Sequence, residues 1–159
     1  MFINFKNSPF LLITFFNFLI FNSSFSHDYY FGKLTIDHPY IIETLPNAKV
    51  AAGYLTITNR GKKSEFLVQA KTSFSSYTEF HKMIMEDNVM KMTKLDKALE
   101  ILPGKTLKLK PKGLHIMFVG LNKKLKKDNK EKVLLVFQHT GKIIVDFNIE
   151  SMDQNHNHK

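Results

Sequence analysis

Apolar and polar residues alternate along most of the chain after residue 30. The alternation comes in short segments, and each places its apolar side chains on one face of an extended strand. A 3.6-residue apolar period does not persist long enough anywhere to predict a helix. The predicted strands are Lys33 to Ile36, Ala51 to Asn59, Ser64 to Ala70, Tyr77 to Met85, Val89 to Leu95, Leu99 to Leu102, Thr106 to Lys110, His115 to Leu121, Val133 to Gln138 and Ile143 to Ile149.

Turn-forming residues separate these segments. They are found at Asn59-Arg60-Gly61, Pro103-Gly104, Pro111-Lys112-Gly113 and Thr140-Gly141, and Gly, Pro and Asn are residues that tight turns favour. Regular short strands with such breaks are typical of a Greek-key β-sandwich or barrel. We therefore expect one all-β domain without internal repeats over residues 27–150.

The first 26 residues follow a different pattern. Lys6 supplies a positive charge, a mostly apolar stretch of 13 residues runs from Pro9 to Phe21, and small residues flank Phe25 where a signal peptidase reads the chain. The apolar stretch is shorter than the roughly 20 residues that a membrane-spanning helix needs. We expect a signal peptide over residues 1–26, cleaved after Ser26, and no membrane span after cleavage. An uncleaved N-terminal anchor is the alternative.

The composition changes once the signal is set aside. Eight of the 15 phenylalanines lie in it, and the other 133 residues suffice for one domain with its own core. The net charge of +9 becomes +8 without Lys6. Because no basic stripe is interleaved with stacking aromatic residues, we expect no nucleic-acid partner. The charge favours an acidic protein or an anionic membrane face, and the lysine-rich residues 123–132 are expected to form a solvated loop.

The sequence contains no cysteine. This excludes a lipid-modified cysteine at the cleavage point and a blue-copper site, which needs a cysteine thiolate. The sequence also shows no nucleophile triad, carboxylate pair or phosphate-binding loop. We therefore expect that the protein is not an enzyme.

Residues with metal-binding chemistry gather between positions 77 and 120. Five of the six methionines outside the signal lie there, together with two histidines. Residues two apart in a strand share a face, so His81 and Met83 point the same way, as do His115 and Met117. Thioether sulfur and imidazole nitrogen favour Cu(I) over harder ions such as magnesium. The set predicts a Cu(I) site.

Packing is the competing explanation for these side chains. Methionine fills irregular cores, so Met83, Met85, Met90 and Met92 are each as consistent with a core as with a metal site. A lone strand histidine is also more often structural than a ligand, and we expect a structural role for the histidines at positions 38 and 139. Ligation is favoured for the set because the alternating methionines are flanked by polar residues and stand beside two histidines.

The turn between the two methionine-bearing strands can form in two ways. A two-residue loop at Glu86-Asp87 would put His81 opposite Met92. A loop at Asp87-Asn88 would put Met83 opposite Met92 instead, with His81 diagonal to it. Both registers keep the set on one face, so the shared face is predicted and the cross-strand partner is not.

Two stretches of the sequence resemble the periplasmic copper chaperones of the PCuAC family. One is the early strand Ala51-Ala52-Gly53-Tyr54-Leu55-Thr56-Ile57-Thr58-Asn59. The other runs from His81 through Val89-Met90-Lys91-Met92 to Leu109-Lys110-Pro111-Lys112-Gly113-Leu114-His115-Ile116-Met117. The resemblance spans nearly the whole chain after the signal.

The family's motif is a histidine, a later methionine and a closing His-x-Met. Ten residues separate His81 from Met92 here, 22 separate Met92 from His115, and one separates His115 from Met117. By that resemblance the Cu(I) ligands are His81, Met92, His115 and Met117. Met83 is a secondary candidate because it shares the face of His81. Two departures stand where the family has glycine, at Asn88 and Lys112. Asparagine tolerates a left-handed backbone, whereas lysine does so poorly.

The resemblance implies a cupredoxin-like Greek-key domain that carries Cu(I) in the periplasm. It also implies delivery to the copper centre of cytochrome c oxidase, through the copper-bearing subunit or another copper-assembly factor. Thioether ligands suit such an oxidising compartment, because thiolates there tend to form disulfides.

Both ends of the exported chain offer further metal ligands. Residues 151–159 are polar, without apolar periodicity, and are expected to form a flexible tail. Met152, His156 and His158 in this tail can bind metal, and by resemblance they would hold a second copper as Cu(II). Cleavage after the signal would also give His27 a free α-amine beside its imidazole, which is another Cu(II) chelate.

Three classes of function remain open. A metallochaperone predicts a Cu(I) site destroyed by His115→Ala or Met117→Ala, and storage or resistance is a variant of that reading. A copper oxygenase that uses His27 predicts a Cu(II) site lost when the N-terminal amine is blocked. A metal-free exported β-sandwich that binds protein predicts no tight copper.

Overall fold

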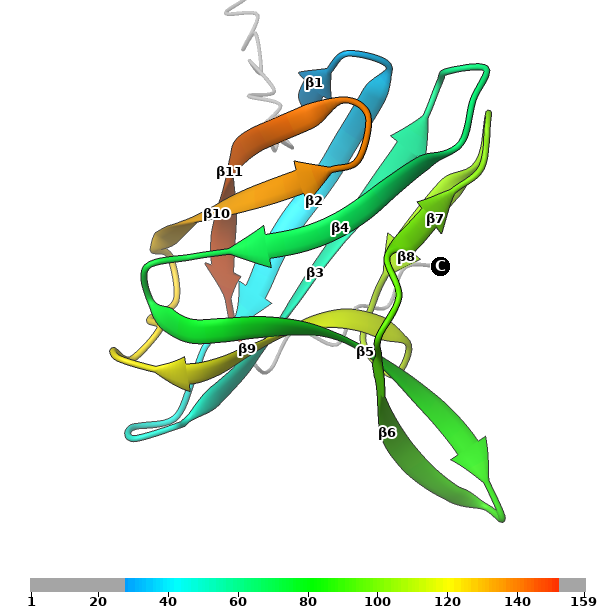
Figure 1. Ribbon diagram of the computed structural model, residues 1–159. Coiled ribbons are helices and arrows are strands. Elements are labelled where there is room, and N and C mark those ends of the chain that lie inside the picture. The colour runs from blue at the N-terminus through cyan, green and yellow to red at the C-terminus, as the bar shows by residue number, and fades with distance from the viewer. Residues whose placement is uncertain (1–27, 152–159) are drawn as a thin grey trace, which may run out of the picture.

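Eleven β-strands, with no helix among them, make up residues 28–151, which are the residues that the computed structural model describes (Figure 1). The strands are β1 (Tyr29–Phe31), β2 (Leu34–Ile42), β3 (Val50–Asn59), β4 (Glu65–Lys71), β5 (Ser75–Glu86), β6 (Val89–Leu95), β7 (Leu99–Ile101), β8 (Thr106–Leu109), β9 (Leu114–Leu121), β10 (Lys130–Phe137) and β11 (Gly141–Glu150). The all-β class predicted from the alternation is confirmed.

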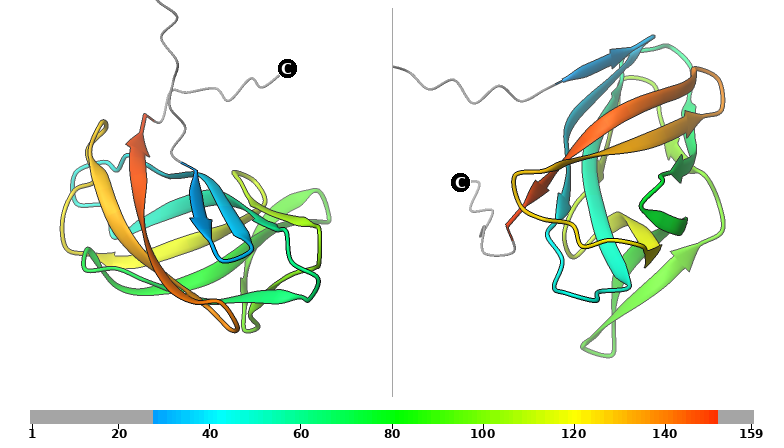
Figure 2. Two further views of the ribbon diagram at one scale, coloured as in Figure 1. Left: turned by 90° about the horizontal axis from the view of Figure 1, so that it is seen from above. Right: turned by 90° about the vertical axis from the view of Figure 1, so that its left-hand side faces the viewer.

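The strands form one sheet whose order differs from their order in the sequence. Hydrogen-bonded neighbours run β6-β5-β9-β3-β2-β11-β10-β4-β7, with β1 beside β2 and β8 beside β3. The pairing of β11 with β2 is parallel, and the other pairings are antiparallel. Figure 2 shows the sheet curling round, and β4 and β5 contact each other although they are distant in the sheet order. The curled sheet therefore encloses the core.

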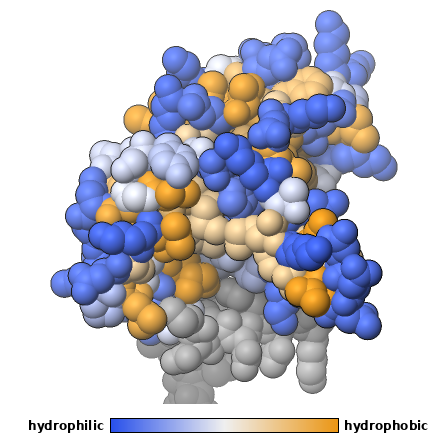
Figure 3. Space-filling model, turned by 60° about the horizontal axis from the view of Figure 1, so that its bottom comes forward, coloured by the Kyte–Doolittle hydropathy of each residue, from blue (hydrophilic) through white to orange (hydrophobic). Residues whose placement is uncertain are grey.

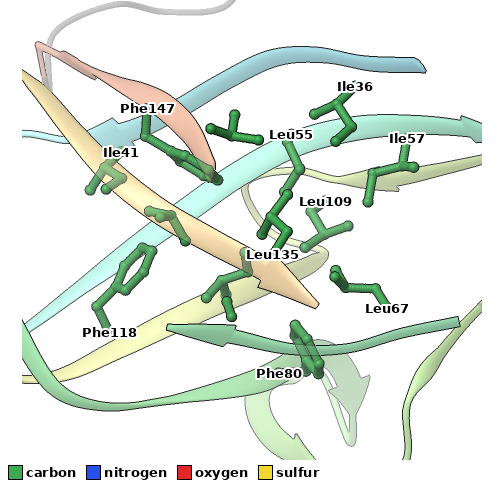
Figure 4. Close-up of a cluster of buried hydrophobic side chains, with 14 of the residues drawn as sticks. Ile36, Ile41, Leu55, Ile57, Leu67, Phe80, Leu109, Phe118, Leu135 and Phe147 are labelled. Atoms are coloured by element: carbon green, nitrogen blue, oxygen red, sulfur yellow. The ribbon is translucent and has the colours of Figure 1, made fainter. Parts of the chain in front are cut away.

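The core consists of the side chains that point to the inside of the curl. It draws on strands from both ends of the sheet order, because alternate residues of each strand face inward. Figure 4 shows Ile36, Ile41, Leu55, Ile57, Leu67, Phe80, Leu109, Phe118, Leu135 and Phe147 in this cluster. Since Phe80 and Phe118 point inward, their chain neighbours His81 and Met117 point to the outer face.

Gly53 lets β3 lie close to the core. A Cβ atom at this position would sit 2.5 Å from Cε2 and 3.1 Å from Cζ of the Phe118 ring. Gly53 also pairs with Ile116 on β9. The glycine therefore sets the distance between the core and the strand that carries His115.

The strand boundaries differ from the predicted ones mainly near the two ends of the domain. β1 was not predicted, because three residues are too few to show alternation. β2 continues to Ile42 past an irregularity between Asp37 and Tyr40, where His38 has a φ of 47° and breaks the alternating pattern. β10 begins at Lys130, inside the expected loop, and Leu125 in the same segment is fully buried.

Several predictions fall on residues outside the described range. The signal peptide over residues 1–26, the N-terminal chelate at His27 and the tail ligands Met152, His156 and His158 all lie there. Within residues 28–151, no helix has the length and apolar character needed to cross a membrane.

Candidate metal centre

The two histidines of the predicted site lie side by side on neighbouring strands. His81 on β5 pairs directly with His115 on β9, and their ring centroids are 5.8 Å apart. Met117 is two residues further along β9 and pairs with Glu79. The register of β5 on β9 therefore brings three of the four predicted ligands to one face of the sheet.

The hairpin between β5 and β6 adopts the second of the two registers considered above. Asp87 and Asn88 form its two-residue turn, with φ values of 51° and 59°. Met83 consequently pairs with Met92, and His81 pairs with Lys94. Met92 lies diagonal to His81 on the same face, because it is two residues from Lys94, the direct partner of His81.

One hydrogen bond fixes which nitrogen of His81 is free. Its Nε2 lies 2.8 Å from Glu79 Oε2, and a carboxylate oxygen accepts, so Nε2 carries the proton. The lone pair of a neutral ring then belongs to Nδ1. Among residues 28–151, this Nδ1 is the buried side-chain nitrogen or oxygen atom without a hydrogen-bond partner. A buried lone pair without a donor fits a metal ligand.

His115 is fixed in the complementary way. Its Nδ1 donates to the carbonyl oxygen of Gly113 at 3.1 Å, which leaves the Nε2 lone pair available. The residue is 4% exposed and packs beside the ring of Tyr54, at a centroid distance of 6.3 Å. Burial lowers the pKa of His115. The hydrogen bond to Gly113 raises this pKa, and the charge of His81 lowers it further. The imidazole therefore stays in the neutral form that binds metal.

Glu79 is a residue of the site that the sequence analysis missed. It holds Nε2 of His81, and its other oxygen pairs with Nζ of Lys94 at 2.8 Å. These two contacts, with Lys94 first, lower the pKa of Glu79, and the ion pair raises that of Lys94. A carboxylate that holds the far nitrogen of a ligating histidine orients the ring and sets its tautomer. The signal in the sequence is the position of Glu79, two residues before His81 on the same strand face.

Three of the five methionines are too exposed for the packing explanation. Met85, Met90 and Met92 are 64%, 41% and 49% exposed, and Met83 and Met117 are half-buried. Within residues 28–151, no group of three His, Cys, Asp or Glu side chains is placed to hold a metal ion. Two imidazoles together with neighbouring thioethers are a donor set that favours Cu(I).

The loop before His115 and the hairpin turn both adopt the conformation expected of glycine. Lys112 has a φ of 58° and Asn88 one of 59°. The loop is closed by two hydrogen bonds, from the Gly113 amide to the Lys110 carbonyl oxygen at 3.1 Å and from the Lys110 amide to the Leu114 carbonyl oxygen at 2.8 Å. The carbonyl oxygen of Gly113 also accepts from the Met83 amide at 3.1 Å. Asn88 and Lys112 therefore replace glycine while they keep the left-handed backbone conformation that glycine favours.

A known protein family matches most of the described part of the chain. A family model described as "Putative lipoprotein LpqE-like" matches residues 34–149. The chain belongs to the LpqE-like family. The match runs from the first residue of β2 to Ile149, the last residue but one of β11, and includes the four candidate ligands.

One curated relative of this LpqE-like protein comes from Leifsonia xyli subsp. xyli and is named "Putative lipoprotein Lxx21020". The two sequences are 30% identical over 88 residues, which is 55% of this chain and 53% of the relative. The chain therefore spans about half the length of the curated relative that it matches.

Solved structures, PCuAC domains among them, share the fold of this LpqE-like protein. The copper-bound PCuAC domain from PmoF2 superposes with a TM-score of 0.69 at 23% identity, covering 79% of this chain and 98% of that domain. Apo-DR1885 from Deinococcus radiodurans superposes with a TM-score of 0.59 at 19% identity, covering 95% and 92%. The cupredoxin-like fold predicted from the sequence is confirmed.

Proposed function

We propose that this LpqE-like protein is an exported copper chaperone. It binds Cu(I) through one nitrogen each of His81 and His115 and through the sulfurs of Met92 and Met117. It then delivers the ion to the copper centre of cytochrome c oxidase, directly or through another assembly factor. The signal over residues 1–26 directs it to the periplasm and is removed.

One observation carries the proposal. Nδ1 of His81 is buried without a hydrogen-bond partner, and it belongs to a ring 5.8 Å from that of His115, whose Nδ1 is already committed to Gly113. The two free lone pairs belong to adjacent rings on one face, beside thioethers. A fold shared with a copper-bound PCuAC domain supports the same choice of metal.

The exposure of the ligands favours a carrier over a permanent metal centre. His115 is buried, whereas Met92 is 49% exposed at the edge of the sheet. A partner can therefore reach one ligand and replace it while the others hold the ion. The bound Cu(I) passes by ligand exchange, so neither protein needs to change oxidation state.

The surface around the site favours an acidic acceptor. Lys94 lies on the same strand face as the two histidines, where it pairs with Glu79, and the chain keeps a net charge of +8 once Lys6 leaves with the signal. Opposite charge on the partner would speed the encounter at low salt. The tail residues Met152, His156 and His158 would add a second site, which would bind Cu(II).

An anaerobic Cu(I) competition titration against a chromophoric chelator tests the proposal. The chain recovered after export is compared with a variant in which His81, Met92, His115 and Met117 are all alanine. We expect one tight equivalent that the variant loses. A His38→Ala, His139→Ala variant is the matched control and should retain it.

The other classes of function predict different results in this titration, in a matching Cu(II) titration and in transfer to a copper-free oxidase fragment. No tight copper in the unmodified chain would contradict the chaperone and favour a protein-binding β-sandwich. A tight Cu(II) site lost on blocking the amine of His27 would favour an oxygenase. Tight Cu(I) that a copper-free oxidase fragment cannot remove would favour storage.

A further inference from the structure

Methionine occupies every position on one face of the outer half of the β5–β6 hairpin. Met83 pairs with Met92, and Met85 pairs with Met90 in the next pair on the same face. The opposite face carries Ile84, Glu86, Val89 and Lys91 in the same part of the hairpin. Sulfur is therefore confined to the face that also carries the two histidines.

Core packing does not explain the outermost of these methionines. Met85 is 64% and Met90 41% exposed, although methionine in a core is normally buried. Figures 1 and 2 show the outer half of β5 and β6 projecting from the rest of the sheet. Figure 3 looks toward this end of the molecule and shows hydrophobic side chains at the surface among hydrophilic ones. The thioethers are accessible to an ion.

The hairpin holds the sulfurs at a defined spacing. Both turn residues, Asp87 and Asn88, have positive φ, which is the geometry of a type I′ turn and fixes the register. Directly paired side chains start about 5 Å apart at Cβ, and the next pair on the same face is about 7 Å further along. Methionine has three rotatable bonds, so neighbouring sulfurs can converge on one ion.

We propose that Met83, Met85 and Met90 form a second Cu(I) site, weaker than the one at the two histidines and adjoining it along the same face of the hairpin. The inference rests on the proposed function. An acceptor or donor meets the ion first at Met85 and Met90, the outermost sulfurs. The ion then moves toward Met92, one Cu–S bond forming as another breaks, and it stays Cu(I) throughout.

The second site lacks imidazole, which explains why it should be the weaker one. Neutral thioethers release no proton when they bind Cu(I), so its affinity should vary little with pH near neutrality. A site of this kind loads and unloads quickly. It would serve as an entry point to the buried histidines.

The test is an anaerobic Cu(I) titration of the exported chain labelled with ¹³C at its methionine methyl groups. We expect two equivalents, the first shifting the methyl signal of Met117 and the second those of Met85 and Met90. The Met85→Leu, Met90→Leu variant keeps similar apolar side chains without sulfur. It should lose the second equivalent and keep the first. A control variant, Ile84→Leu with Val89→Leu on the opposite face, should keep both.

Each other outcome separates this inference from the proposed function. One equivalent in both the unmodified chain and the Met85→Leu, Met90→Leu variant would overturn the second site and leave the first intact. Two equivalents in both would also overturn it, because the second ion would then bind elsewhere. No equivalent in any chain would contradict the proposed function itself.

Discussion

His81 and His115 face each other across β5 and β9, with ring centroids 5.8 Å apart and one nitrogen of each ring already committed to an oxygen acceptor. The nitrogen ligands therefore come from β5 and β9, two strands that have neighbours on both sides. The sulfur of Met92 comes from β6, the last strand in the sheet order. The two kinds of ligand should respond differently to mutation.

Replacing a buried histidine should cost more affinity than replacing the exposed methionine. We expect His115→Ala to weaken Cu(I) binding by at least about a hundredfold, which corresponds to about 2.8 kcal/mol. Met92→Leu should weaken it by about tenfold, or about 1.4 kcal/mol. Met83 lies opposite Met92 and can substitute for its sulfur. Chelator competition measures both constants, with His139→Ala as the control. Equal losses in the two variants would contradict this division of roles.

Removing Glu79 should weaken copper binding without removing a ligand. Loss of a carboxylate that orients a ligating histidine typically costs about 10–100-fold in metal affinity, and we expect this range for Glu79→Ala. The copper affinity of Glu79→Gln should lie between those of the unmodified protein and Glu79→Ala, because the amide oxygen of the glutamine can still accept from His81. The ¹⁵N shifts of His81 report the tautomer and should change in Glu79→Ala. Unchanged shifts with unchanged affinity would refute the positioning role.

The strand pattern was predictable because one face of the sheet is buried. Alternation located β6 at Val89–Leu95, and it placed the other long strands within a few residues of their observed ends. It failed at β1, which is too short to alternate, and at β2, where the positive φ of His38 interrupts the pattern. The sequence alone also cannot give the order of strands that are distant in the chain, such as β9 between β5 and β3.

The chemistry of the site was predictable and its supporting contacts were not. Residue type and parity indicated the two histidines and the methionines. The hairpin register depended on a choice between two loops that the spacing allowed equally. The role of Glu79 depends on which nitrogen of His81 it binds, and only the structure shows that this is Nε2.

Lys112 should be replaceable by glycine with a gain in stability. A left-handed backbone costs an L-residue about 1–2 kcal/mol, and glycine costs about 0.5–1 kcal/mol more in the unfolded chain. We expect Lys112→Gly to raise the unfolding free energy by up to about 1 kcal/mol, measured by urea denaturation. Asn88→Gly should gain less, because asparagine tolerates this conformation. A loss of stability in Lys112→Gly would contradict the strain.

The buried carboxylate of Glu65 should make stability fall in acid. Burial alone would raise its pKa, but hydrogen bonds from Thr140, Phe66 and His139 outweigh burial and hold the pKa below its usual value of 4.5. A lowered native pKa adds stability that is present above pH 4.5 and lost as the pH falls through the native value.

Denaturation between pH 6 and pH 3 in Glu65→Gln tests this contribution. The variant should be less stable at neutral pH, because buried donors left unpaired cost about 1–3 kcal/mol each. Its stability should also depend less steeply on pH over the acid range. Parallel curves for the two proteins would show that Glu65 does not cause the loss.

Gly53→Ala should disturb both the core and the site. The new Cβ would meet the Phe118 ring at 2.5 Å, and overpacking of this kind typically costs about 1–3 kcal/mol. Because Gly53 pairs with Ile116 next to His115, copper affinity should fall as well. Phe118→Leu in the same chain should restore part of the stability. Additive losses in the double variant would contradict a direct clash.

The position of β6 at one end of the sheet also bears on aggregation. An exposed terminal strand with apolar side chains invites pairing with a second copy of the chain, which would bury its methionines. Lys91 and Lys94 place positive charge along this strand, with side chains 53% and 54% exposed. Lys91 is paired with Glu86 and Lys94 with Glu79, so a second copy that paired here would have to desolvate or break these ion pairs. These charged groups therefore disfavour edge-to-edge pairing and leave the methionine sulfurs free to bind a metal ion.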